Sequence, residues 1–121
     1  MADRHGFTIK HRDEFERSGR WALARRSLGV ESFGMNLVEI APGDRIPEHD
    51  EIVRDQEEVF AVLTGDATMV VDGREHPAPA GTFARVGPER TRTVVNSGEQ
   101  PVTLLIVSAP TTSGYEPADW S

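Results

Sequence analysis

GDRIPEHDEIVRDQEEVFAVLTG, residues 43–65, joins a polar loop to an apolar run of strand composition. The first part, residues 44–56, is interrupted by Pro47 and carries several acidic side chains, which is typical of a loop. The second part, residues 57–64 (EEVFAVLT), is rich in β-forming residues and ends at Gly65, a turn residue. The stretch therefore predicts a long loop that leads into a buried strand.

Three side chains in this stretch form a candidate metal site. His49 and Glu51 are two residues apart, so an extended chain places both on the same face. Glu58 stands at the start of the apolar run and supplies a second carboxylate. Imidazole and carboxylate groups suit a divalent transition metal such as Fe, Mn, Ni or Zn. A histidine among carboxylates is also common on acidic surfaces without a metal, so these residues alone leave both interpretations open.

Runs of similar composition recur on both sides of this stretch, about 8–12 residues apart. Turn residues separate them, most clearly Asp72-Gly73, where glycine accepts the positive φ of a two-residue hairpin turn. No segment after residue 30 has the length and the 3.6-residue period of a helix. The pattern predicts an all-β sandwich or barrel. The predicted strands are residues 33–40, 57–64, 67–71, 74–76, 82–86, 92–95 and 102–108.

The loop and strand resemble the first sequence motif of the cupin superfamily. That motif runs Gly, five residues, His-x-His, three or four residues, Glu, six residues, Gly. Here five residues separate Gly43 from His49, and six separate Glu58 from Gly65, so both ends fit. The middle departs from the motif, because Glu51 stands at the second histidine position and the spacer to Glu58 is about two residues longer.

The second cupin motif runs Gly, five residues, Pro-x-Gly, two residues, His, three residues, Asn, and two registers compete for it. Started at Gly81, the motif keeps every spacing through Asn96 and places Arg92 at the histidine position. Started at Gly73, it fits Pro79 and Gly81 but then fails at the later positions. We prefer the first register, because it ends at an Asn-Ser-Gly turn before a last strand.

The resemblance covers roughly residues 33–108 and implies a specific architecture. Cupins are double-stranded β-helices, that is, jelly-roll barrels of two antiparallel sheets with the site inside. The expected organisation is an N-terminal arm at residues 1–30, a barrel at residues 31–110 and an extended C-terminal tail at residues 111–121. Small stand-alone cupins often form homodimers through such an arm. A homodimer with the arm in its interface is therefore expected.

Arg92 decides between the functions that this architecture allows. A guanidinium stays protonated and offers no lone pair, so it does not replace a metal-binding histidine. Arg92 either pairs with Glu58 or Glu51 in place of a metal, or points into the cavity and binds an anionic ligand. In a third orientation it points outward and leaves His49 and the two carboxylates to a metal.

Three functions follow from these orientations. The first, which we favour, is a cupin of unassigned activity that binds a small polar or anionic molecule with no metal or a weakly held one. Its ligand-binding residues would be Arg92, His49, Phe60 and Met69. The second is a metal-dependent enzyme of the dioxygenase or isomerase type that uses the three metal candidates. The third is a non-catalytic structural cupin with an Arg92–carboxylate pair in its interior.

The composition excludes several classes of binding partner. The 121 residues include 20 Asp+Glu and 13 Lys+Arg, a formal net charge of −7, which is the wrong sign for a general nucleic-acid or anionic-membrane binder. No apolar run approaches the roughly 20 residues of a membrane-spanning helix, and the first residues lack the apolar core of a signal peptide. The chain has no cysteine, which excludes disulfides and thiolate ligands. We therefore expect one cytoplasmic domain with a small-molecule partner.

Overall fold

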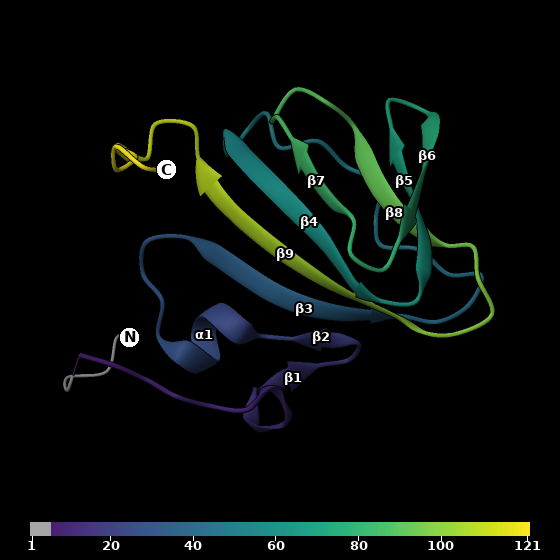
Figure 1. The fold of residues 1–121 in the computed structure, drawn as a ribbon, viewed down its shortest axis with the longest axis horizontal. Helices are drawn as coiled ribbons and strands as arrows, with labels where there is room; N and C mark the ends of the chain where they lie inside the picture. The colour runs from purple at the N-terminus through teal and green to yellow at the C-terminus, as the bar shows by residue number, and fades with distance from the viewer. Residues whose placement is uncertain (1–5) are drawn as a thin grey trace.

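The computed structural model describes residues 6–121 and folds them into two antiparallel sheets that face each other (Figure 1). The strands are β1 (Arg17–Ser18), β2 (Trp21–Ala22), β3 (Gly34–Ile40), β4 (Gln56–Thr64), β5 (Asp66–Val71), β6 (Arg74–Pro79), β7 (Phe83–Val86), β8 (Arg92–Asn96) and β9 (Val102–Pro110). The larger sheet has the order β1-β2-β3-β9-β4-β7 and the smaller sheet the order β6-β5-β8. Buried apolar side chains from both sheets form one core, and the all-β prediction is confirmed.

Side chains on the inner face of the larger sheet change from polar to apolar along the strands. Directly opposed residues in antiparallel strands share a face, and the face repeats every second residue. The apolar rows are buried and fill the core, whereas the polar rows lie where β4 begins and β9 ends. From the polar end inward, three successive rows are Gly34–Ser108–Glu58, Asn36–Ile106–Phe60 and Val38–Leu104–Val62.

Strand β8 supplies the facing residues from the smaller sheet. Arg92, Val94 and Asn96 alternate along it, and all three are at most 1% exposed. The Asn96 amide nitrogen donates to the carbonyls of Ile40 and Gln100, each at 2.8 Å, and its oxygen accepts from a backbone N–H at 3.0 Å. This buried side chain thereby ties the end of β3 to the turn before β9. Arg92, two positions from Val94 at the other end of β8, faces the polar rows.

Part of the predicted N-terminal arm belongs to the larger sheet. Strand β2 pairs with β3, with Trp21 opposite Val38, and β1 pairs with β2. The helical segments are the 3₁₀ turn η1 (Arg12–Glu14) and the helix α1 (Ala24–Leu28), which packs beside β3. Residues 1–5 of the arm lie outside the described residues. The homodimer expected from this arm stays a prediction.

The predicted C-terminal tail leaves the barrel after β9. Residues 111–121 form turns and irregular structure, at the upper left of Figure 1. Tyr115 and Trp120 are 73% and 90% exposed, so both aromatic residues lie largely in solvent. Trp120 is therefore a side chain that can be replaced without disturbing the core.

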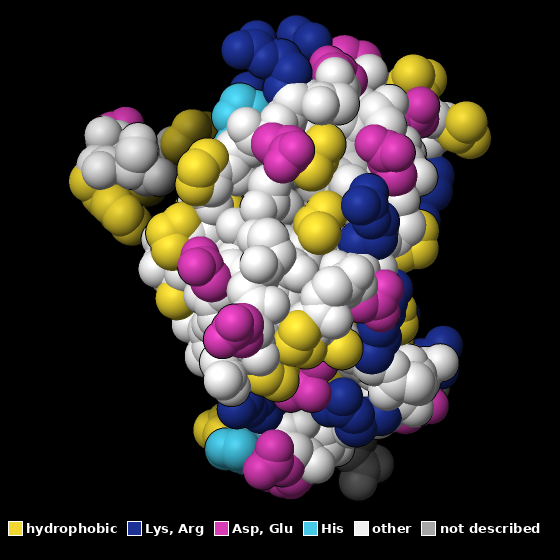
Figure 2. All heavy atoms as spheres, turned by 90° about the vertical axis from the view of Figure 1, so that its right-hand side faces the viewer, with side chains coloured by type: hydrophobic (Ala, Val, Ile, Leu, Met, Phe, Trp, Pro, Cys, Tyr) yellow, Lys and Arg dark blue, Asp and Glu magenta, His cyan; other side chains and the backbone are white. Residues whose placement is uncertain are grey.

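The outer surface of the smaller sheet faces the viewer in Figure 2. Acidic and basic side chains lie beside one another over this face, and apolar side chains occur as separate small groups. Helices long and apolar enough to cross a membrane are absent from residues 6–121. The view shows no single charged or apolar region that stands out as a site.

Gly65, between β4 and β5, is required by the close approach of the chain before β9. Its φ is +89°, and a Cβ added there would lie 2.6 Å from the carbonyl oxygen of Pro101. We expect Gly65→Ala to lower the free energy of unfolding by about 2–3 kcal/mol, measured by urea titration, because strain and a backbone clash add. Gly73→Ala is the control, since Gly73 also has a positive φ but open space around it; a loss of about 1 kcal/mol is expected there. Equal losses in the two variants would contradict the role of the close approach.

Candidate metal and ligand site

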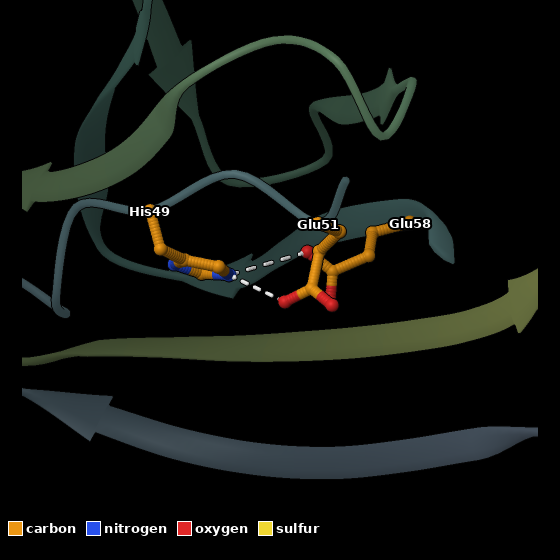
Figure 3. A group of neighbouring side chains, drawn as sticks. All are labelled: His49, Glu51 and Glu58. Atoms are coloured by element: carbon orange, nitrogen blue, oxygen red, sulfur yellow. Dashed lines mark ion pairs between the residues drawn. The ribbon is translucent and has the colours of Figure 1, made fainter. Parts of the chain in front are cut away.

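The three residues predicted as metal ligands converge at the polar end of the barrel (Figure 3). His49 and Glu51 come from the loop between β3 and β4, and Glu58 comes from β4. His49 Nε2 lies 3.1 Å from Glu51 Oε2 and 3.7 Å from Glu58 Oε1. One donor atom from each residue lies within 4.8 Å of the other two, a spacing that could hold a metal ion. The i,i+2 spacing and the motif position of Glu58 thus predicted this grouping of side chains, whereas their role as metal ligands stays a prediction.

Backbone hydrogen bonds to the smaller sheet hold the loop over the site. The His49 N–H donates to the Arg92 carbonyl at 3.1 Å, and the Arg92 N–H donates to the His49 carbonyl at 2.8 Å. The Glu51 N–H donates to the Pro88 carbonyl at 2.9 Å. Consequently the loop behaves locally as an added strand, and both side chains are directed to the inside of the barrel.

The tautomer of His49 follows from its hydrogen bond to the backbone. Nδ1 lies 2.9 Å from the Pro47 carbonyl oxygen, which only accepts, so Nδ1 carries a proton and donates it. In the neutral ring, Nε2 then has a lone pair, and this lone pair faces the oxygens of Glu51 and Glu58. Three groups of this kind repel one another unless a cation lies among them. Either a proton on Nε2 or a metal ion satisfies the geometry.

Glu58 carries the least solvated carboxylate of the cluster. Burial raises the pKa of Glu58 above its ordinary value, and the charge of Glu51 raises this pKa further. The positive charges of Arg92, His49 and Arg54 lower the pKa of Glu58 but do not cancel these two effects. Among the described residues, Glu58 Oε1 is buried without a hydrogen-bond partner. This oxygen therefore has a lone pair available for a cation.

Arg92 lies behind Glu58, inside the barrel wall. Its side chain is 0% exposed, and Nη1 lies 3.6 Å from Glu58 Oε1. Nη2 donates to the Gly87 carbonyl, whereas Nε and Nη1 have no hydrogen-bond partner among the described residues. Of the three orientations considered from the sequence, this is the one in which Arg92 pairs with Glu58. The guanidinium offsets one of the two carboxylate charges in the cluster.

A cavity of about 330 Å³ opens beside the cluster. His49 and Phe60, two of the predicted ligand-binding residues, line it. Arg92 and Met69 are not among its lining residues, because Arg92 lies behind Glu58 and Met69 is buried in the core. The lining consists of Trp21, Arg25, Gly34, Met35, Asn36, Ile46, Pro47, His49, Arg54, Glu58, Phe60, Ile106 and Ser108.

Sequence reasoning missed two of the lining residues that matter chemically, Arg25 and Arg54. Trp21 from β2, an apolar side chain for which the sequence allowed either the core or a cavity, lines the cavity because β2 pairs with β3. Arg25 from α1 reaches the cavity because the arm folds onto β3, and nothing in its local sequence signals this. Arg54 lies in the spacer between Glu51 and Glu58, which is longer than the cupin motif allows. That extra length was a signal that the loop carries an additional residue to the site.

Comparison with known proteins agrees with this architecture. The family model described as "Cupin domain" matches residues 36–108, and no curated protein matches the chain. A cupin protein from Bacteroides fragilis has a similar structure, with a TM-score of 0.78 and 17% identity over 94% of this chain and 92% of that one. The jelly-roll prediction is confirmed.

Two further solved structures resemble the chain and carry descriptions of activity. One is described as a sugar phosphate isomerase from a cupin superfamily of Silicibacter pomeroyi, with a TM-score of 0.69 and 25% identity over 82% of this chain and 73% of that one. The other is a predicted oxalate decarboxylase from Thermotoga maritima, with a TM-score of 0.71 and 15% identity over 85% of this chain and 99% of that one. Similarity to the second shows the fold alone.

Proposed function

The chain belongs to the cupin family, and on that premise we propose that its barrel binds a small polar or anionic molecule beside a weakly held divalent metal ion. His49, Glu51 and Glu58 would be the metal ligands. The proposal rests on one observation. His49 Nδ1 donates a hydrogen bond to the Pro47 carbonyl, so the lone pair of Nε2 faces two carboxylates. The adjoining cavity of about 330 Å³ provides room for the molecule.

The donor set fits such an ion. One imidazole and two carboxylates suit Fe, Mn, Ni or Zn, and the unpartnered Glu58 Oε1 supports a ligand role. A bound ion would act as a Lewis acid toward an oxygen of the small molecule. The chain's own groups orient that molecule: the Pro47 carbonyl fixes the His49 ring, and Phe60 and Ile106 exclude water from one wall. Arg92 opposes the ion's charge, which is why we propose weak binding.

A metal-dependent isomerase or dioxygenase is the second candidate. Its support is that His49 and Glu58 both line the cavity, so an ion between them would be open to a bound molecule. The structure described as a sugar phosphate isomerase, at 25% identity, adds to this support. This candidate shares the metal site with the first and differs only in whether the bound molecule is converted.

The proposal is tested by the metal content of untagged protein purified without chelators or added metal, measured by mass spectrometry before and after soaking with Fe, Mn, Ni and Zn. We expect close to one ion per chain at saturation. We also expect His49→Gln to bind the ion more than about 10-fold more weakly, because it removes a ligand.

His76→Gln is the matched control for this experiment. His76 lies exposed on β6, in the smaller sheet, so its loss should leave the metal affinity unchanged. No bound ion after soaking with all four metals would overturn the metal part of the proposal. In that case a proton on His49 Nε2 would be the cation between the carboxylates.

A further inference from the structure

We infer that the cavity binds a small amphipathic carboxylate whose anionic group pairs with Arg54 at the cavity mouth. The inference rests on the proposed small-molecule function and names the chemical class of the molecule. Arg54 thus takes the place of the buried Arg92, which the sequence analysis expected to bind the anionic group. Arg54 is exposed to solvent and at the same time lines the cavity, which places it at the mouth.

Arg54 is one of several surface arginines without an acidic partner, and it also lines the cavity. Its guanidinium takes part in no ion pair with a carboxylate within the described residues. Arg25, the other cation of the lining, donates to the Val30 carbonyl at 3.2 Å. By contrast, carboxylates lie within 3.4 Å of Arg20, Arg26, Arg85 and Arg90. A positive group left unpaired at a cavity mouth is available to an anionic ligand.

The turn that carries Arg54 is fixed on both sides. The Asp55 N–H donates to the Ile52 carbonyl and the Gln56 N–H donates to the Glu51 carbonyl, each at 3.3 Å. Asp55 has a positive φ of 52°, and its carboxylate accepts from the Thr111 hydroxyl. The backbone at Arg54 is therefore held before any ligand arrives, which lowers the entropic cost of binding.

The distribution of charge in the cavity gives the ligand a direction. The interior end carries Glu58 with Glu51 beside it, and the mouth carries Arg54 and Arg25. In the metal-free protein, an anionic group is repelled by the first end and attracted by the second. Between the two ends the wall has apolar side chains from Trp21, Met35, Ile46, Phe60 and Ile106, together with the polar Asn36 and Ser108.

These walls favour a carboxylate over a phosphate. A planar carboxylate accepts two parallel hydrogen bonds from one guanidinium. A single negative charge also costs less to bring beside an apolar wall than the larger charge of a phosphate. The apolar middle of the cavity would then contain the hydrocarbon body of the ligand, and its far end would approach His49.

Trp21 provides a reporter for this inference. The chain has 2 tryptophans, Trp21 in the cavity wall and Trp120 in the exposed tail. In a Trp120→Phe background, Trp21 is the single tryptophan, and its fluorescence is titrated with hexanoate, hexanamide and inorganic phosphate, with Zn²⁺ present and with a chelator. We expect a saturable response to hexanoate and binding of hexanamide that is about 10-fold weaker or more.

Substitution of Arg54 tests the assignment. Arg54→Gln should weaken hexanoate about 10-fold or more and leave hexanamide unchanged, because only the charged group loses its partner. Arg74→Gln, an exposed arginine on β6 outside the cavity lining, should leave both unchanged. Thermal unfolding of each variant shows whether the fold is retained.

Three outcomes would overturn the inference. Equal binding of hexanamide and hexanoate, or an Arg54→Gln variant that binds both as before, would remove the anionic class while the proposed small-molecule function stands. Arg54-dependent binding of phosphate without hexanoate would replace the carboxylate by another anion. No response of Trp21 to any of the three compounds would remove the ligand part of the proposed function as well, whatever the metal content shows.

Discussion

Replacing Glu58 with glutamine is expected to weaken the binding of a divalent metal by more than about 100-fold. The substitution keeps the size of the side chain but removes a charged ligand, and loss of a group that only supports a ligand already costs about 10–100-fold. Glu58 is also the ligand with a buried, unpartnered oxygen, so no neighbouring group would replace it as a metal ligand. Isothermal titration with Zn²⁺ or Mn²⁺ measures the change.

The same substitution is expected to remove a pH dependence of stability when the metal is removed by a chelator. Burial and Glu51 raise the pKa of Glu58, so the folded state binds its proton more tightly than the unfolded state does. The wild type therefore loses stability as the pH rises from about 4.5, the ordinary pKa, through the higher pKa of the folded state. Glutamine does not titrate. The free energy of unfolding of Glu58→Gln, relative to that of the wild type, should thus rise as the pH increases from about 4.5 through the pKa of Glu58 in the folded state, and stay constant above it.

Glu57→Gln is the control for both parts of this prediction. Glu57 is the neighbour of Glu58 on β4 but is exposed and pairs with Arg85 at 3.0 Å on the outer side of the sheet. Its substitution should change neither the metal affinity nor the pH dependence of stability. If Glu58→Gln kept the metal, the ion would be held elsewhere. If its difference in stability from the wild type stayed constant with pH, ionisation of Glu58 would not limit stability.

The parts of the structure that the sequence predicted are those set by local periodicity. Alternation in residues 57–64 places Glu58, Phe60 and Val62 on one face of β4, and the structure has all three on the inner face. Turn residues marked the strand ends because the backbone conformation at such a position also restricts which residue fits there. Gly65 stands where a positive φ and a close carbonyl leave no room for a side chain.

The parts that the sequence left open depend on contacts between distant segments. The orientation of Arg92 depends on β4, which places Glu58 opposite it across the barrel. The residue spacing within β8 does not reveal this contact. Met69 has a strand position suited to either cavity or core, and the packing of β5 against β6 and β8 decides for the core. Trp21 enters the cavity wall only because β2 pairs with β3.

Replacing Arg92 with methionine is expected to strengthen metal binding by about 100-fold while it destabilises the metal-free protein. A fixed positive charge several ångströms from a doubly charged ion costs on the order of several kcal/mol at an effective dielectric constant near 20. Arg92 is 0% exposed, so water screens this charge poorly. Its removal leaves the Glu58 carboxylate buried without a cation, and breaking such a pair costs about 3–5 kcal/mol.

The two effects of Arg92→Met are linked through the ion. In the metal-free variant two carboxylates face each other with only His49 between them, whereas a bound ion supplies the missing positive charge. Saturating metal should therefore raise the melting temperature of Arg92→Met by more than it raises that of the wild type. Differential scanning fluorimetry over a metal titration measures both shifts.

Arg92→Lys separates the charge of Arg92 from its packing. Lysine retains the positive charge near Glu58, so its metal affinity should stay close to that of the wild type even if the altered shape lowers stability. In the double variant Glu58→Gln/Arg92→Met both charges are absent, and the stability lost in Arg92→Met should largely return because no buried charge is left unpaired. An unchanged metal affinity in Arg92→Met would show that the guanidinium does not oppose the ion. The proposed weak binding would then need another cause.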